Sequence, residues 1–342
     1  MKKIISLANE DKKYNQLITS VGVLLEQARK EVYSQVNNIL VKTYWEIGKM
    51  IVELEQKGEE KAEYGEKLLD KLSCDLKLRY GKGFSRSNVT YMRLFYLRYN
   101  KSETLSHKLS WSHYFELLKI DDNLERSFYE KQSIADSWSV RELKRQKNSA
   151  LFERVALSKD KQGVIALSKK GLQTDTAEDL VKSPYILEFL GIPEDYRYSE
   201  KELEQRVIDN LQKFLLELGK GFAFIGRQFR ITLNNKNYYV DLVFYHRILK
   251  CFVLIDLKIS EVTHYDIGQM NLYLNYFKEE EMVEGDSEPI GIILTKEKEK
   301  VFIKYALGGI SNKLFVSKYQ LYLPDKKELE QQLQQILKSE KE

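Results

Sequence analysis

Cysteine is scarce in this sequence of 342 residues, where it occurs twice, at Cys74 and Cys251. Histidine occurs four times. Two cysteines and a few scattered histidines exclude a disulfide framework and a four-ligand zinc site. So low a cysteine content is typical of proteins in a reducing compartment. We therefore expect a cytoplasmic protein.

Long apolar runs are absent as well. A membrane helix needs about 18 or more consecutive apolar residues, and no uncharged stretch of this sequence approaches that length. A secretory signal needs an apolar stretch of about 7–15 residues after its basic start. Here the charged residues Glu10 and Asp11 follow the basic start too closely for such a stretch. We therefore expect no signal peptide and no membrane partner.

Proline is missing from residues 1–183, which fits a helical region because proline breaks helix interiors. Apolar residues recur at helical spacing over 17–55, and a second helix is predicted over 64–80. A turn at Gly81–Gly83 follows, and Ser85 can cap a third helix. Helix, glycine turn and capped helix form the outline of a helix-turn-helix unit, with a plain helical hairpin as the alternative.

Basic residues gather around this turn. The segment 71–101 contains eight basic residues and a single acid, Asp75. Such a segment favours a polyanionic partner, although a solvated protein surface can have the same composition. We predict a helical DNA-binding domain over 12–165, with nucleic-acid contacts from Lys82, Arg86, Asn88 and Arg93.

The pattern changes toward the C-terminus. We predict a transitional linker over 166–195, a second domain over 196–325 and a charged tail over 326–342. The second domain should be a mixed sheet covered by helices. Its predicted helices cover 200–218, 261–277 and 298–306, and its predicted strands cover 222–233, 238–246, 251–258, 290–294 and 314–323.

Two acids stand inside apolar strands of this domain: Asp241 in YYVDLVFY and Asp256 in CFVLIDLK. Buried carboxylates are costly unless they are paired or bind a metal. Because side chains alternate along a strand, Asp256 and Lys258 point to the same face, and Asp241 can join them if the strands pair. Two carboxylates form a hard oxygen site that suits Mg²⁺, although an ion pair at a strand edge is the structural alternative.

Residues around this motif could complete a site for phosphodiester hydrolysis. Gln269 and Tyr273 are four positions apart on a predicted helix and can face the same way. Glu204, on the preceding helix, could be a further metal or water ligand, or simply an exposed helical acid. Lys258 could orient or deprotonate the attacking water, or stabilise charge that develops on the phosphate.

The motif set Asp241, Asp256-x-Lys258 and Gln269-x-x-x-Tyr273 resembles that of RecB-type nucleases in the PD-(D/E)xK superfamily. More closely, the stretch GFAFIGRQFRITLNNKNYYVDLVFYHRILKCFVLIDLK resembles the YhcG-type family of predicted bacterial nucleases. The resemblance covers roughly residues 15–325. In the N-terminal half it is carried by YWEIGKMI (44–51), YGEKLL (64–69), LSCDL (72–76), GKGFSRSN (81–88), LSWSHY (109–114) and WSVREL (138–143).

The resemblance implies a restriction-endonuclease-like C-terminal fold and a helical, winged-helix-like DNA-binding N-terminal region. It implies an endonuclease dependent on Mg²⁺ or Mn²⁺, with Asp241, Asp256, Lys258, Gln269 and Tyr273 as site residues. Arg227 lies in a stretch that also matches the family. We expect it either to contact phosphate or to form a structural ion pair. Asp256 departs from the commoner glutamate, and its shorter side chain draws a metal closer to the strand.

Other functions fit the same residues. A DNA-binding or complex-assembly protein whose nuclease core no longer cuts would keep the fold, and an RNA-processing nuclease would use the same chemistry. DNA is the expected partner. A homodimer is also expected, because double-strand cutting with one active site per chain needs two chains.

Overall fold

The computed structural model of the chain describes residues 2–57, 62–101, 105–157, 159–182, 184–193, 196–297, 307–308, 310 and 312–338. It divides into two compact units, Met1–Lys144 and Arg145–Glu342. The helix predicted over 298–306 lies outside the described residues. In the part of the chain that is described, no helix is both long and apolar enough to cross a membrane.

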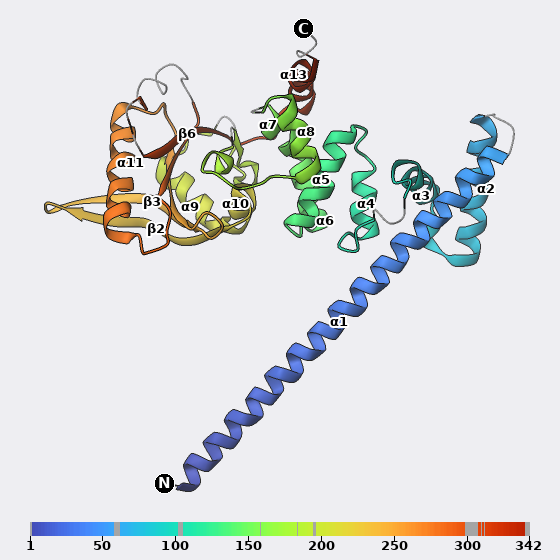
Figure 1. The fold of residues 1–342 in the computed structure, drawn as a ribbon, viewed down its shortest axis with the longest axis horizontal. Helices are drawn as coiled ribbons and strands as arrows, with labels where there is room; N and C mark the ends of the chain where they lie inside the picture. The colour runs from blue at the N-terminus through green and yellow to red at the C-terminus, as the bar shows by residue number, and fades with distance from the viewer. Residues whose placement is uncertain are drawn as a thin grey trace. The chain divides into compact units, whose positions relative to one another are not determined.

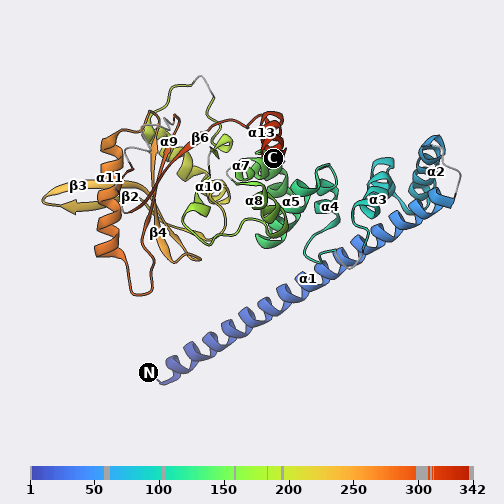
Figure 2. The ribbon, with the colours of Figure 1, turned by 45° about the horizontal axis from the view of Figure 1, so that its top comes forward.

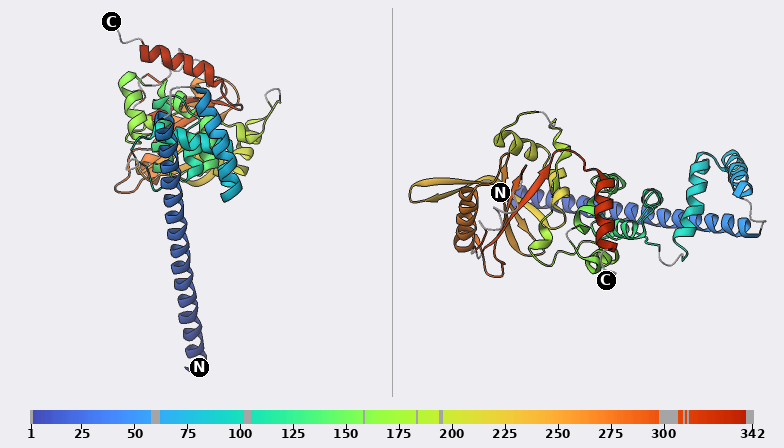
Figure 3. Two further views of the ribbon diagram at one scale, coloured as in Figure 1. Left: turned by 90° about the vertical axis from the view of Figure 1, so that its right-hand side faces the viewer. Right: turned by 90° about the horizontal axis from the view of Figure 1, so that it is seen from above.

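The N-terminal unit is helical, as predicted, and its described residues form no strand. The described residues of this unit therefore do not include the paired strands that form the wing of a winged-helix domain. The 56 residues of α1 form one continuous helix (Figure 3). The helices of this unit are α1 (Lys2–Lys57), α2 (Ala62–Tyr80), α3 (Arg86–Arg98), α4 (Trp111–Leu117), α5 (Asn123–Ala135) and the start of α6 (Val140–Asn148).

The predicted helix, turn and capped helix are present as α2, a short 3-10 turn over Lys82–Phe84, and α3. Gly81 adopts a φ of 93°, which favours glycine, and the Ser85 hydroxyl accepts a hydrogen bond from the Asn88 backbone N–H at 3.2 Å. Gly48 lets α1 approach α3 closely, because a Cβ there would lie 2.0 Å from the Met92 carbonyl oxygen.

The N-terminal part of α1 does not bury its apolar residues. Leu25, Val32 and Val36 lie in the stretch 17–55 whose apolar spacing predicted the helix, and they are 53%, 63% and 49% exposed. Farther along the helix, Ile51 is buried against Leu69 of α2 and Val89 of α3. The described residues of the unit thus build their core around the C-terminal part of α1.

The described residues of the C-terminal unit form a six-stranded sheet in the order β1-β6-β5-β4-β3-β2. The three strands β2, β3 and β4 pair antiparallel, whereas β4, β5, β6 and β1 pair parallel. The mixed sheet is therefore confirmed. The strands are β1 (Tyr185–Ile186), β2 (Phe222–Leu233), β3 (Lys236–His246), β4 (Cys251–Lys258), β5 (Ile290–Thr295) and β6 (Lys313–Gln320).

Helices cover both faces of this sheet (Figure 2). On one face, α9 (Glu200–Asp209) and α10 (Leu211–Leu218) bury Leu203, Val207 and Phe214 against the strands. On the other face, α11 (His264–Tyr276) buries Met270 and Leu274. The helix predicted over 200–218 is two helices, separated at Asn210.

The predicted domain boundaries differ from the structure. The C-terminal unit begins at Arg145, before the predicted linker over 166–195. This segment contains the end of α8 (Lys161–Lys170) and strand β1, and it buries Tyr185 and Leu187 in the core. It is part of the unit because β1 pairs with the distant β6. Within the predicted tail, α13 (Lys326–Lys338) buries Leu333.

Candidate active site

Strands β3 and β4 bring the two predicted acids together. Leu242 pairs with Ile255, so the next position along the antiparallel ladder sets Asp241 opposite Asp256 on the same face. The Asp241 backbone N–H donates to Asp256 Oδ1 at 3.3 Å, and the Leu257 N–H donates to Asp241 Oδ2 at 2.8 Å. The strand alternation that the sequence suggested therefore places both carboxylates at one point.

Both acids are at least partly shielded from solvent. The Asp256 residue is 3% exposed, whereas Asp241 is half-buried. Burial raises the pKa of Asp256 to about 7, and the neighbouring charge of Asp241 adds to the effect. Burial also raises the pKa of Asp241. The pair therefore holds a proton more readily than ordinary carboxylates do, and a cation between the acids would relieve the same repulsion.

A third carboxylate reaches this pair through Gln228. The Gln228 side-chain amide donates to Glu204 Oε2 at 2.8 Å and to Asp241 Oδ1 at 3.0 Å. Burial raises the pKa of Glu204, and Asp241 raises it further. The structure thus brings Glu204 to the predicted site. Its link through Gln228 was not predicted, because no periodic pattern marks a glutamine with a φ of 48°.

Lys258 lies two residues after Asp256 and is held from two sides. Its Nζ is 3.4 Å from Asp266 Oδ1 on α11 and 3.7 Å from Glu200 Oε2 on α9. Burial alone would lower the pKa of the Lys258 ammonium, but the surrounding carboxylates, Glu200 first among them, raise it. Lys258 therefore remains a cation within the acidic site.

Glu200 and Asp266 were both missed by the sequence analysis. Glu200 stands four residues before Glu204, so the two acids share one face of α9. That spacing was a signal that could have found it. Asp266 closes the capping box of α11 with Thr263, and this role alone would explain an acid there.

Gln269 and Tyr273 lie behind the acids. The Gln269 side-chain amide donates to the Tyr273 hydroxyl, and this hydroxyl donates to the Tyr239 carbonyl oxygen at 3.0 Å. Tyr273 is fully buried, and burial together with the charge of Asp256 raises its pKa. The pair thus supports the backbone of β3 two residues before Asp241.

The other predicted contacts fall in different places. Arg227 is exposed on β2, and its Nη1 donates to Gln205 Oε1 on α9 at 2.8 Å, beside the Gln228 bridge. In the N-terminal unit, Arg86 pairs with Asp70.

The remaining predicted residues of the N-terminal unit also differ in their surroundings. Arg93 Nε contacts Glu55 Oε2 at 2.6 Å, and Asn88 Oδ1 accepts from Trp111 Nε1 at 2.9 Å. Lys82 is exposed at the turn. Of the four predicted nucleic-acid contacts, Arg86, Asn88 and Arg93 therefore have structural partners within their own unit.

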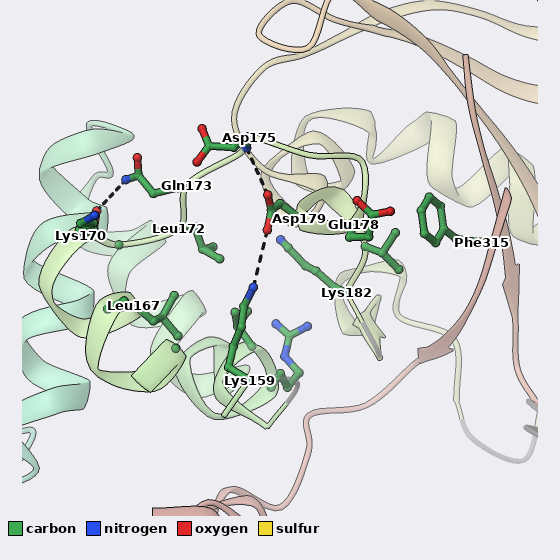
Figure 4. Close-up of a pocket in the computed structure, with 16 residues that line it drawn as sticks. Lys159, Leu167, Lys170, Leu172, Gln173, Asp175, Glu178, Asp179, Lys182 and Phe315 are labelled. Atoms are coloured by element: carbon green, nitrogen blue, oxygen red, sulfur yellow. Dashed lines mark hydrogen bonds and ion pairs between the residues drawn. The ribbon is translucent and has the colours of Figure 1, made fainter. Parts of the chain in front are cut away.

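The C-terminal unit also has a cavity of about 540 Å³ beside α8 (Figure 4). Lys159 Nζ lies 3.6 Å from Asp179 Oδ1, and Asp179 Oδ2 accepts from the Asp175 backbone N–H at 3.2 Å. The residues described around this cavity include none of the predicted site residues. The cavity is therefore separate from the acids of β3 and β4.

Two family models and one relative match most of the chain. The DUF1016 N-terminal domain matches residues 20–154, and the YhcG PDDEXK nuclease domain matches residues 178–334. YhcG of Escherichia coli (strain K12), whose name marks it as a candidate nuclease, is 38% identical over 94% of this chain and 93% of its own length.

Two solved structures are also similar. A repair endonuclease from Pyrococcus abyssi is 22% identical over 39% of this chain and 50% of its own, with a TM-score of 0.26. EndoMS in its apo form is 18% identical over 38% and 49%, with a TM-score of 0.24. Both likenesses are too partial to add to the match along nearly the whole chain. On the strength of that match, the chain belongs to the YhcG family, whose C-terminal part is a PDDEXK nuclease domain.

Proposed function

We propose that this protein hydrolyses phosphodiester bonds in DNA with a divalent cation, Mg²⁺ or Mn²⁺. The observation that carries the proposal is the pairing of Asp241 with Asp256, to which Gln228 links Glu204. The pKa values of all three carboxylates are raised. Their oxygens form the hard donor set that these cations prefer. The residues present therefore fit such an ion, with Asp241 and Asp256 as its main ligands.

A bound cation would lower the pKa of a water molecule and offset charge on the phosphate. Lys258 would supply a fixed positive charge next to the reacting phosphate. Its raised pKa favours this electrostatic role over deprotonation of water. Gln269 and Tyr273 would keep β3 in place beneath the acids, so they are positioning residues.

DNA contacts of the N-terminal unit would come from the turn between α2 and α3. Lys77, Arg79 and Lys82 are all exposed there, and Tyr80 is 70% exposed beside them. These cations can contact phosphates without losing a partner in the fold. Arg86 and Arg93 would contribute only by exchanging their acidic partners for phosphate. Arg227 would contact phosphate at the edge of the active site.

A homodimer has support in α1. Ile18, Leu25, Val32 and Ile39 recur every seven residues and are between 53% and 63% exposed. A seven-residue apolar repeat is the pattern by which two helices pair. We expect a dimer by light scattering and a monomer for the double variant Leu25→Lys and Val32→Lys. A wild-type monomer at micromolar concentration would contradict this expectation.

Nicking of supercoiled plasmid tests the proposed activity. Wild type should cut with Mg²⁺ or Mn²⁺ and not with EDTA, whereas Asp256→Ala should lose at least about 100-fold in rate. The control Asp209→Asn removes an exposed acid of α9 and should cut normally. DNA binding by Asp256→Ala in EDTA should match wild type.

Equal cutting by wild type and Asp256→Ala would contradict the assignment. Binding without any cutting would identify a nuclease core that is catalytically silent. Side-by-side RNA substrates complete the test, because faster cleavage of RNA than of DNA would replace DNA as the substrate.

A further inference from the structure

The outer part of the β2–β3 hairpin extends beyond the rest of the sheet. Its five residue pairs run from Phe229 with Val240 to Leu233 with Lys236. The pairing of β3 with β4 ends at Leu242, before this part begins. Residues 229–240 therefore form a two-stranded ribbon, which projects past α11 in Figure 1. We refer to these residues as the ribbon.

The two faces of the ribbon differ in burial. On one face, Ile231 and Val240 are fully buried in the cluster that α11 covers. This packing makes the ribbon a rigid extension of the core. The opposite face carries Arg230 and Thr232 of β2 and Asn237 and Tyr239 of β3, all of them exposed.

The inner end of the ribbon adjoins the candidate active site. Asp241 directly follows Val240, the last residue of the ribbon. Gln228 directly precedes Phe229, and its side-chain amide donates to Asp241 Oδ1 at 3.0 Å. Tyr239 is also tied to the site through its carbonyl oxygen, which accepts from the Tyr273 hydroxyl. A molecule bound along the ribbon would therefore lie next to the candidate site.

The charge of the ribbon is opposite to that of the site. From Arg227 to Val240 the sequence contains three cations, Arg227, Arg230 and Lys236, and no acid. No hydrogen bond or ion pair from the side chains of Arg230 or Lys236 is described in the structure. Acids dominate the neighbouring site, so phosphates of a polyanion would be drawn to the ribbon and held beside it.

We propose that the exposed face of the ribbon binds double-stranded DNA and leads one strand to the site. The inference rests on the proposed nuclease function. A two-stranded ribbon fits the major groove of B-form DNA, about 12 Å wide, whereas the major groove of A-form RNA is too narrow. Proteins that hold single strands commonly stack the bases on several aromatic side chains. Among the four exposed residues named above, Tyr239 is the single aromatic one, so this face suits a duplex better than a single strand.

In this arrangement Arg230 contacts phosphate from the exposed face. Lys236 pairs with Leu233 at the tip of the ribbon and so starts from the opposite face, where its long side chain contacts phosphate at the wall of the groove. Thr232 and Asn237 lie between these two cations and face the bases. Thr232 Oγ1 donates to Asn237 Oδ1 at 2.9 Å, which fixes both side chains in one orientation. The ribbon therefore combines sequence-independent phosphate contacts with two polar side chains that are able to read base edges.

Binding of a fluorescent 20-base-pair DNA duplex in EDTA, measured by anisotropy over a range of salt, tests the proposal. The double variant Arg230→Glu and Lys236→Glu should bind at least tenfold more weakly and show a salt dependence reduced by about two phosphate contacts. The matched control, Lys213→Glu and Lys327→Glu, reverses two exposed lysines of α10 and α13 and should stay within about threefold of wild type.

The milder single variant Arg230→Gln should lose affinity severalfold, which keeps the test valid if the double variant unfolds. Binding by the ribbon variants equal to that of the control would overturn the proposal. An equal loss of affinity for single-stranded DNA or for an RNA duplex would overturn the assignment to DNA duplexes. Failure of the nuclease function is a separate result, because wild type would then bind the duplex and cut nothing with Mn²⁺.

Discussion

Two buried carboxylates of the C-terminal unit have opposite surroundings. Glu217 is 0% exposed and lies 3.0 Å from Arg154 Nη1 and 3.2 Å from Arg145 Nη2. Asp256 is 3% exposed and faces Asp241. Burial would raise the pKa of both acids. The neighbouring cations, Arg154 first and then Lys182 and Arg145, leave the pKa of Glu217 lowered, whereas that of Asp256 is raised to about 7.

The comparison separates an acid that stabilises the fold from one that serves a site. Glu217 joins α10 to Arg154 of α7 (Leu151–Ala156) and accepts the Ile186 backbone N–H of β1 at 3.0 Å, so its charge is satisfied by the fold. Asp256 lies beside a second acid, and this arrangement costs stability until a proton or a cation arrives. Variants at the two positions should therefore act in opposite directions.

The largest effect is expected for Glu217→Gln. The change leaves Arg154 buried without its carboxylate, and breaking a buried ion pair on one side costs about 3–5 kcal/mol of unfolding free energy. Urea unfolding measures this loss. As a control, Glu202→Gln removes a partly exposed pair with Arg206 and should cost no more than about 1 kcal/mol. A loss for Glu217→Gln as small as that of the control would contradict the comparison.

Asp256→Asn should instead stabilise the metal-free protein above neutral pH. The pKa of Asp256 is about 7 in the folded state and about 4 in an unfolded chain, so the folded state binds its proton more tightly. The stabilisation by this proton is complete below pH 4 and is lost as pH rises toward 7. At pH 8 the variant should gain on the order of 2–4 kcal/mol relative to wild type.

Thermal unfolding in EDTA from pH 5 to pH 8 checks this expectation. The difference in unfolding temperature between Asp256→Asn and wild type should widen with pH in favour of the variant. A difference that stays constant across this range would show that Asp256 ionises like an ordinary acid.

A smaller effect is expected for Gln228→Ala. Its amide donates to both Glu204 and Asp241, so the change removes two hydrogen bonds to charged groups and should cost about 1 kcal/mol without metal. Mn²⁺ should shrink this cost, because the ion would then neutralise the acids. Unfolding temperatures with and without Mn²⁺ measure the difference. The neighbouring Gln205→Ala should show no such dependence on metal, and an equal dependence in both variants would argue against the bridge.

The part of the site that could be predicted from the sequence is the part fixed by strand periodicity. Alternation alone set Asp256 and Lys258 on one face, and the antiparallel pairing brought Asp241 opposite. Gln228 and Asp266 come from other elements, and only the folded sheet shows that they reach the same place.

The N-terminal contacts were harder to predict for the same reason. The basic character of 71–101 is visible in the sequence, but the acids that pair with Arg86 and Arg93 lie on α2 and α1. The segment 166–195 was predicted as a linker because glycine, proline and serine interrupt it, and its strand, β1, is only two residues long. Its pairing with β6, more than 130 residues later, leaves no local pattern.

The central claim is that one divalent cation is held between Asp241 and Asp256. Anomalous diffraction from a crystal soaked in Mn²⁺ tests it most directly. We predict a single strong peak in this unit at a coordination distance of about 2.0–2.6 Å from a carboxylate oxygen of each acid, and loss of the peak in Asp256→Asn. A peak that touches neither acid, or one that persists unchanged in the variant, would contradict the account.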